Sequence, residues 1–328
     1  MYKKIAILLL IVTTFILNAC QKNIDVFVPD PGQQNSADTI WSNSIAATAP
    51  VLTLQTNLRT ELIKDSIEIS ATIATQLTIN GLQCTFPANC CISNLGQIIT
   101  GKIYVEALLL KKKGDMILFN KPTTAYGNIL VSGGEIFISL KKDGKELQLA
   151  PNATIQIKYT DVPVNPAMKL FFGDETNPLA FNWLPNNDSL NNRVAAGQQV
   201  YEIITNHLRW INVDYFYDTT GITRSVVSAH LPSNYTNANT SVFLVFKDFR
   251  SVIGMYADVP ERRFVSGKVP NGKAAIVVAI SKQGNDYFLG KETITTGVTT
   301  TPGTTNQRVQ LSPVKTSLAD IKSYLATL

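Results

Sequence analysis

The stretch GEIFISLKKDGKELQL, residues 134–149, decides the fold class of this 328-residue chain. Residues 134–140 are rich in Ile and Phe, which is typical of a β-strand. The turn residues Lys142-Asp143-Gly144-Lys145 follow, and an Asp-Gly pair favours a tight hairpin because both residues tolerate a positive φ. Residues 146–149 then supply a second strand. The stretch therefore predicts an antiparallel hairpin.

Similar strand patterns occur on both sides of this hairpin. Residues 66–70 alternate polar and apolar side chains, as a half-buried strand does. Short strands separated by turn residues are typical of antiparallel sandwiches, so we expect an all-β protein with two β-sandwich-like domains. The other predicted strands cover residues 102–108, 154–159, 200–205, 225–230, 241–247 and 274–281, with a hairpin pair at 287–290 and 292–296.

The chain closes with a predicted short helix. Ser317 is a good N-cap residue, and Asp320 stands three positions later, as in a capping box. The apolar residues that follow share one face of a helix. The predicted organisation is a signal peptide at 1–19, a flexible tether at 20–50, an N-terminal β-sandwich domain at 51–163, a connecting region at 164–199, and a C-terminal β-rich domain with its terminal helix at 200–328.

The first twenty residues predict the cellular location of the protein. Lys3 and Lys4 precede the apolar run 5–17, which is too short to span a bilayer and suits a signal peptide. The run ends in Leu17-Asn18-Ala19-Cys20, which resembles a bacterial lipoprotein box. That resemblance implies cleavage before Cys20 and lipid attachment at Cys20; an ordinary signal peptide with a chance cysteine is the alternative. We expect a lipid-anchored outer-membrane protein that faces the periplasm or the cell surface.

The charge balance argues against a nucleic-acid partner. The formal net charge is +5, and it falls to +3 without residues 1–19, which carry two lysines and no acid. Only 16% of the residues are charged, as is typical of extracytoplasmic β-rich proteins. Because the charge is too balanced for a basic membrane-binding patch, we expect the protein to contact the membrane through the N-terminal lipid. We expect no cofactor.

Three further cysteines admit two interpretations. In an oxidising compartment, Cys84 can pair with Cys90 or Cys91 and leave one thiol over. Alternatively, all three are small buried apolar residues. The absence of a nearby histidine and the spacing argue against a zinc site.

A longer resemblance rests on scattered motifs in both halves of the chain. The motifs are residues 86–89, Gly96, 100–102, 113–117, 122–124, 130–135, Gly144, 146–147, 210–214 with Phe216, and 269–272. They resemble those of an uncharacterised family of Bacteroidetes outer-membrane lipoproteins with an N-terminal β-sandwich domain. Relatives often have Gly where Arg209 stands and Cys where Val213 stands. The Phe86-Pro87-Ala88 opening also resembles, distantly, the β-sandwich shared by ankyrins, netrin receptors and zonula occludens proteins. The resemblance implies an all-β extracytoplasmic lipoprotein and carries over no catalytic residues.

The sequence assigns no catalytic residue and no metal ligand. Ser132 lies in no nucleophile elbow, and His207 and His230 are expected to be satisfied or solvent-facing. Asp174 and the polar residues 186–188 suit a hard cation, but loop polarity explains them as well.

The cluster Trp210-Ile211-Asn212-Val213-Asp214-Tyr215 offers the clearest candidate ligand contacts. Aromatic rings with Asn and Asp can bind a sugar, whereas alternation along a strand would bury Trp210 in the core. The candidate contacts are Trp183, Trp210, Asn212, Asp214 and Tyr215.

From these observations we expect a non-catalytic binding or structural module that contacts an envelope protein or an extracellular polymer. A carbohydrate-binding surface lipoprotein and a hydrolase with an unrecognised carboxylate site are the alternatives.

Overall fold

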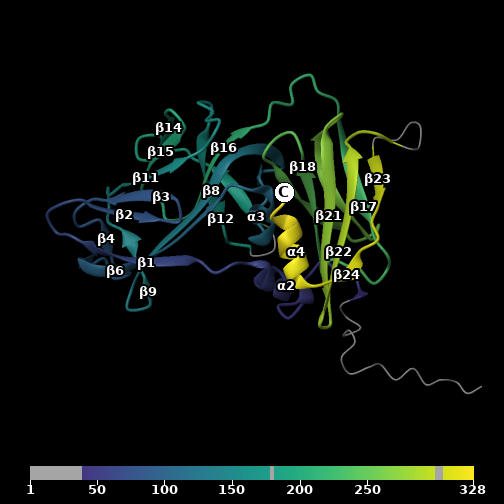
Figure 1. Ribbon diagram of the computed structural model, residues 1–328, viewed down its shortest axis with the longest axis horizontal. Helices are drawn as coiled ribbons and strands as arrows, with labels where there is room; N and C mark the ends of the chain where they lie inside the picture. The colour runs from purple at the N-terminus through teal and green to yellow at the C-terminus, as the bar shows by residue number, and fades with distance from the viewer. Residues whose placement is uncertain (1–38, 178–180, 300–305) are drawn as a thin grey trace, which may run out of the picture. The chain divides into compact units, whose positions relative to one another are not determined.

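The computed structural model describes residues 39–328 except 178–180 and 300–305. Its longest described strand is β8 (Asn128–Lys142), which contains Phe137. The predicted turn follows β8, with positive φ at Asp143 and Gly144, but only the two residues of β9 (Lys145–Glu146) continue the hairpin. Residues 148–149 of the predicted second strand pair with residues 91–92 in another sheet instead. The protein is all-β with sandwich-like sheets, as expected (Figure 1). The expected signal peptide, Cys20 and the expected tether up to residue 38 lie outside the described residues.

β8 belongs to the first eight-stranded sheet. The order of its main path is β1-β6-β8-β16-β12-β13, and two short strands, β7 and β9, also pair with β8. All of these pairings are antiparallel. The bounds are β1 (Ile63–Ile69), β6 (Gly101–Leu110), β7 (Thr124–Ala125), β9 (Lys145–Glu146), β12 (Lys169–Asp174), β13 (Asn182–Pro185) and β16 (Arg209–Phe216).

A five-stranded sheet covers one face of this first sheet. Its order is β14-β15-β11-β3-β2. Three short strands from the same half of the chain form a separate small sheet in the order β10-β4-β5. Side chains of both large sheets form one core, in which Ile138, Ile157 and Ile203 are fully buried. The bounds are β2 (Thr75–Ile79), β3 (Leu82–Phe86), β4 (Cys91–Ile92), β5 (Ile98–Ile99), β10 (Gln148–Leu149), β11 (Ile155–Thr160), β14 (Arg193–Ala196) and β15 (Val200–Thr205).

The second eight-stranded sheet holds the C-terminal part. Its order is β23-β17-β20-β19-β18-β21-β22-β24, with β23 parallel to β17. Residues from both halves of the sheet, such as Val227 and Val277, share one core, so the sheet curves onto itself. The bounds are β17 (Arg224–His230), β18 (Thr240–Phe246), β19 (Val252–Asp258), β20 (Arg263–Pro270), β21 (Ala274–Gln283), β22 (Asp286–Thr295), β23 (Asn306–Gln310) and β24 (Val314–Thr316).

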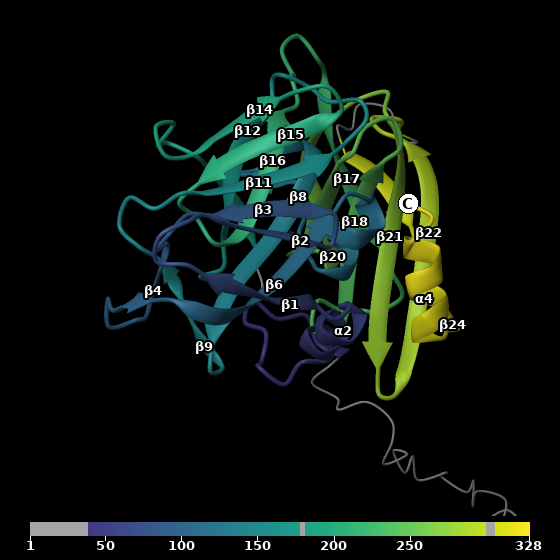
Figure 2. The same ribbon diagram turned by 60° about the vertical axis from the view of Figure 1, so that its left-hand side comes forward.

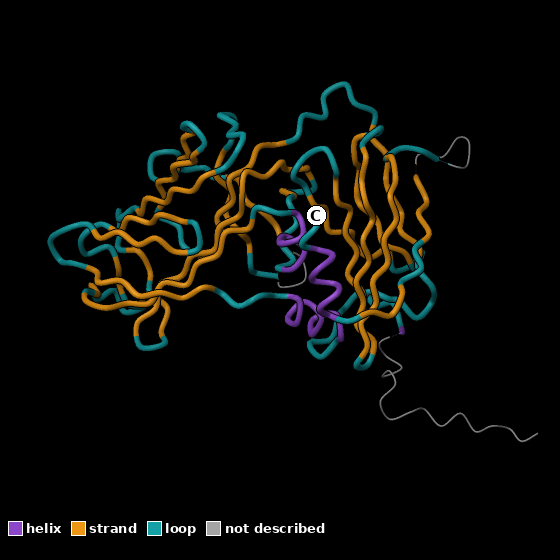
Figure 3. Tube along the Cα trace, viewed as in Figure 1, coloured by secondary structure: helices purple, strands orange, loops and turns teal. Residues whose placement is uncertain are grey.

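Three described helices, α2 (Pro50–Leu58), α3 (Lys113–Leu118) and α4 (Leu318–Leu325), lie between the two eight-stranded sheets (Figures 1 and 2). Their apolar faces join a core that includes Phe137 and Trp210 of the first sheet and Val278 of the second. Figure 3 shows this helical layer in purple between the orange strands. The Ser317 Oγ accepts a hydrogen bond of 3.0 Å from the Asp320 backbone amide, as the sequence predicted for the last helix.

Long-range pairing changes the expected organisation. Strands β15 and β16, assigned from the sequence to the C-terminal domain, pair with β11 and β8, so the sheets divide the chain between Phe216 and Arg224 rather than at residue 200. The expected connecting region 164–199 supplies β12, β13 and β14. Local patterns cannot reveal these assignments, because they depend on partners far away in the sequence.

The end of the expected tether is also structured. Asn237 exchanges hydrogen bonds with the Ser42 backbone, and the Trp41 ring lies 4.9 Å from that of Phe264. Residues 39–49 therefore pack on the second sheet, and α2 starts at Pro50. The polar composition of residues 20–50 predicts a flexible segment, and it gave no sign of these contacts with Asn237 and Phe264.

Candidate functional site

The predicted contacts Asn212 and Asp214 lie inside the molecule. Asn212 Nδ2 donates a 2.7 Å hydrogen bond to Asp214 Oδ2, and Ser132 Oγ donates one of 3.3 Å to Asn212 Oδ1. All three side chains are buried on the face of the first sheet that meets the helices. They therefore form part of a buried polar cluster with Glu135, which pairs across the strands with Asn212.

Two glycines shape this cluster. The register of β8 and β16 shifts between Val213 and Asp214, beside Gly133 and Gly134. A Cβ on Gly133 would lie 3.0 Å from the Val213 carbonyl oxygen, and one on Gly134 would lie 3.2 Å from the Tyr159 hydroxyl. The glycines thus let β16 and Tyr159 approach β8 closely, and the extra residue Gly133 in β8 places Ser132 opposite Asp214.

Burial dominates the electrostatics of the cluster. It raises the pKa of Asp214 to about 7, against the effect of the hydrogen bonds from Ser132 and Asn212. Burial, followed by the nearby Asp214 charge, raises the pKa of Glu135 well above its ordinary value. Both oxygens of Glu135 and Oδ1 of Asp214 find no hydrogen-bond partner within the described part of the chain. A carboxyl in such surroundings favours its neutral form.

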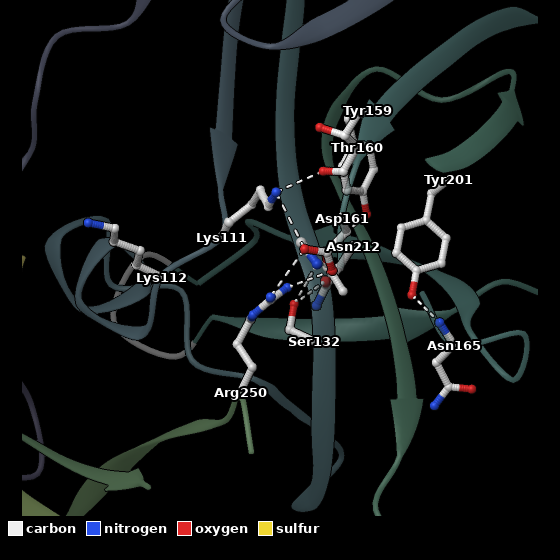
Figure 4. A network of polar contacts seen from close by, with 12 residues as sticks. Lys111, Lys112, Ser132, Tyr159, Thr160, Asp161, Asn165, Tyr201, Asn212 and Arg250 are labelled. Atoms are coloured by element: carbon white, nitrogen blue, oxygen red, sulfur yellow. Dashed lines mark hydrogen bonds and ion pairs between the residues drawn. The ribbon is translucent and has the colours of Figure 1, made fainter. Parts of the chain in front are cut away.

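An ion-pair network adjoins the cluster (Figure 4). Arg250 binds both oxygens of Asp161, at 3.1 and 3.2 Å, and Lys111 Nζ lies 3.4 Å from Asp161 Oδ1. The Ser132 amide donates a 2.9 Å bond to the Arg250 carbonyl. Because Arg250 precedes β19 and Asp161 follows β11, the network joins the first half of the chain to the C-terminal sheet.

The predicted aromatic contacts also belong to the interior. Trp183 is fully buried and donates a 2.9 Å bond to the Pro122 carbonyl, and Trp210 is 6% exposed. Lys121 Nζ lies 3.5 Å from the Phe181 ring centre and 4.8 Å from that of Trp210. Burial lowers the pKa of Lys121 to about 8. These tryptophans therefore pack as core residues and form no surface platform for sugars, and Tyr215 is half-buried.

The three cysteines lie buried with free thiols. The Cys90 and Cys91 sulfurs are 3.4 Å apart, and burial raises the pKa of Cys84 to about 12. This arrangement matches the interpretation as small apolar core residues rather than the disulfide.

A groove lined by both apolar and polar side chains opens around the turn between β15 and β16. Its larger part has a volume of about 1070 Å³ and its smaller part about 380 Å³. The parts meet at Asn206 and His207, which line both. Other lining residues are Tyr126, Phe172, Asp174, Glu175, Asn186, Asn187 and Asp188 in the larger part, and Asn94, Glu146, Gln148 and Arg209 in the smaller.

Aromatic surfaces lie within this groove. The His207 ring stacks on Phe172 with ring centres 4.0 Å apart. Tyr126 is 69% exposed, in a two-residue turn where its φ is 49° and that of Gly127 is 76°. Burial lowers the pKa of His207, so the ring is neutral near pH 7.

Arg209 forms ion pairs with one carboxylate from each part of the groove. Its guanidinium lies 2.7 Å from Glu175 and 2.9 Å from Glu146. The φ of Arg209 is 72°, in the left-handed region that glycine prefers. The hydrogen bond to Glu175 raises the pKa of Arg209, so the bridge stays charged.

Three carboxylates of the groove, Asp174, Glu175 and Asp188, have lowered pKa values and act as acceptors. A hydrogen bond from the Thr176 side chain lowers the pKa of Asp174, and one from Asn191 lowers that of Asp188. Burial works against ionisation of Glu175, but Arg209 leaves its pKa below the ordinary value. The described residues contain no group of three or more His, Cys, Asp or Glu placed to hold a metal ion.

The sequence pointed to Asp174 and residues 186–188 either as oxygen ligands for a hard cation or as ordinary loop polarity, and it gave no sign that Tyr126, Phe172 and Arg209 are site residues. Comparison with protein-family models and with curated proteins gives no match. In the part of the chain that the structure describes, no helix is both long and apolar enough to cross a membrane.

Proposed function

We propose that this protein is a lipid-anchored cell-envelope protein that binds an extracellular polysaccharide in the groove between Tyr126, His207 and Arg209. The supporting observation is the stacked His207–Phe172 pair and the exposed Tyr126 beside a row of amide and carboxylate acceptors. Sugar rings pack their C–H faces on aromatic rings, and their hydroxyls need such acceptors.

The size of the groove favours a chain of sugars over a single one. Its two parts are contiguous and together exceed the volume usual for a small-molecule site. The acids are held by Arg209 or by their own loops, which preorganises them to accept hydrogen bonds. Anchoring at Cys20, as the resemblance to Bacteroidetes lipoproteins implies, would keep this groove at the membrane surface.

Affinity electrophoresis in gels that contain laminarin, dextran, xylan or polygalacturonate tests the binding. We expect the chain to be retarded by at least one polymer. His207→Ala and Tyr126→Ala should weaken that retardation about tenfold, because a stacked aromatic contributes about 1.4 kcal/mol. Tyr104→Ala is the matched control, since Tyr104 is 50% exposed on β6 and lines neither part of the groove. Equal retardation of all variants would refute the groove as the binding site.

Metabolic labelling with a radioactive fatty acid tests the anchor. The chain with Cys20 should carry label and sediment with membranes, and Cys20→Ala should do neither. Label on the Cys20→Ala chain would contradict attachment at this cysteine.

A further inference from the structure

A smaller pocket lies next to the groove and differs from it in charge. It has a volume of about 300 Å³ and is lined by Gly127, Asn128, Ile129, Phe216, Tyr217, Thr219, Arg224 and Lys268. We refer to it as the basic pocket. Its volume suits one sugar-sized group.

Two cations of the basic pocket lie on neighbouring strands. Arg224 pairs with Pro270, and Val226 pairs with Lys268, so Arg224 and Lys268 are diagonal neighbours on one face of the second sheet. Both side chains are exposed, and neither has an ion-pair partner among the residues described. Two like charges side by side without a counter-charge leave a positive site for an anion.

No carboxylate lines the basic pocket. The nearby Asp218 lies outside the lining, and a 2.9 Å hydrogen bond from the Thr220 amide lowers its pKa and holds it in its own turn. Lys273 Nζ lies 5.9 Å from the centre of the Tyr217 ring and adds a third positive charge close by. The pocket therefore favours an anionic group over a neutral or cationic one.

Its aromatic wall is firmly supported. Phe216 is 42% exposed and meets Phe171 edge to face with ring centres 5.3 Å apart. Tyr217 stacks on Phe249 at 4.7 Å. These supported rings offer a surface on which a sugar ring can pack.

The turn between β7 and β8 places the basic pocket beside the groove. Tyr126 lines the groove, whereas the next two residues, Gly127 and Asn128, line the basic pocket. Successive Cα atoms lie only about 3.8 Å apart, so one extended ligand can pass over this turn. We propose that the basic pocket binds the carboxylate or sulfate group of an acidic polysaccharide whose adjoining sugars occupy the groove. This inference rests on the proposed function and names the class of polymer.

Binding to matched pairs of polymers tests the inference by affinity electrophoresis. The pairs are polygalacturonate against its carboxyl-reduced form, and dextran sulfate against dextran. We expect the charged member of at least one pair to bind about tenfold more tightly, since a hydrogen bond to a charged group contributes that much. The polygalacturonate pair reports a carboxylate, and the dextran pair reports a sulfate.

Two double variants test whether Arg224 and Lys268 cause the preference for the charged polymer. Arg224→Gln with Lys268→Gln should abolish the preference for the charged polymer and leave binding of the neutral one unchanged. Arg308→Gln with Lys102→Gln removes two exposed charges elsewhere, so this control should keep the preference. An equal loss in both double variants would overturn the inference in favour of nonspecific attraction.

The two proposals fail in different ways. If His207→Ala weakens binding of a neutral polymer but charged and neutral polymers bind alike, the groove stands and the basic pocket is refuted. If the preference persists in Arg224→Gln with Lys268→Gln, the basic pocket is likewise refuted. If no polymer is retarded at all, both proposals are contradicted.

Discussion

Asp214 in the interior and Asp174 in the groove lie on neighbouring strands of one sheet and behave in opposite ways. Asp214 is fully buried, and burial raises its pKa to about 7. Asp174, on the neighbouring strand β12, lies in the groove, where the hydrogen bond from Thr176 lowers its pKa. Burial thus makes the first a group that responds to pH, while the second remains an ionised acceptor for ligands.

We expect the largest difference between Asp214 and Asp174 in how the free energy of unfolding depends on pH. A raised folded-state pKa means that the contribution of Asp214 is favourable below 3.8 and is lost as the pH rises through about 7. The loss corresponds to about 4 kcal/mol. Asp214→Asn should remove that part of the decline in the free energy of unfolding between pH 4 and 8, measured by urea denaturation. Asp174→Asn is the control and should keep the decline; an unchanged profile in Asp214→Asn would mean that the carboxyl is not buried.

Breaking the ion-pair network should have the next largest effect. Arg250→Met leaves the Asp161 carboxylate, which is 4% exposed, with only Lys111 beside it. We expect the free energy of unfolding at pH 7 to fall by about 3 kcal/mol. Arg263→Met breaks the more exposed pair with Asp258 and should cost about 0.5 kcal/mol. Equal costs would show that burial does not distinguish the two pairs.

Gly173 connects the two regions, since it lines the groove and its other side faces the core. A Cβ there would lie 2.6 Å from the Trp210 Cβ and 2.8 Å from the Phe181 ring. Gly173→Ala should therefore cost about 2 kcal/mol through overpacking. Gly254→Ala meets Pro122 at an ordinary 3.5 Å and should leave the urea midpoint unchanged. A stable Gly173→Ala chain would contradict the close packing of β12 on Trp210.

Arg209 should show the smallest change in stability. Arg209→Gly relieves a left-handed backbone worth about 1 kcal/mol and loses exposed ion pairs worth about as much. The free energy of unfolding of Arg209→Gly should stay within about 0.5 kcal/mol of the wild-type value, whereas Arg209→Ala should be about 1 kcal/mol less stable than Arg209→Gly. A more stable Arg209→Ala would exclude backbone strain at this residue.

The sequence predicted elements whose patterns are local. The strand and turn of residues 134–145 and the Ser317 cap were correct because their conformations follow from neighbouring residues. The break expected at Gly290 was wrong, since β22 runs unbroken through it. A Cβ on Gly290 would lie 3.0 Å from Pro313, so this glycine serves close packing rather than a turn.

The groove could not be predicted from local patterns. Its residues come from separate segments near 126, 172–175, 186–188 and 206–209, and only the pairing of β7, β8, β16, β12 and β13 in the first sheet brings them together. Conversely, the Trp210–Asp214 cluster attracted attention because aromatic and polar residues suit both a core and a site. Alternation along β16 does not say which face is covered; the helices and the second sheet decide that.

The helical layer determines how the chain can be made. Helix α2, near residue 50, packs against β21, and α4 closes the chain against α3. The first sheet therefore cannot cover its second face until α4 has been synthesised. A nascent chain that stops near residue 216 would expose Phe137 and Trp210, so such fragments should need a chaperone, and a chain that includes α4 should fold slowly because these contacts join residues far apart in the sequence.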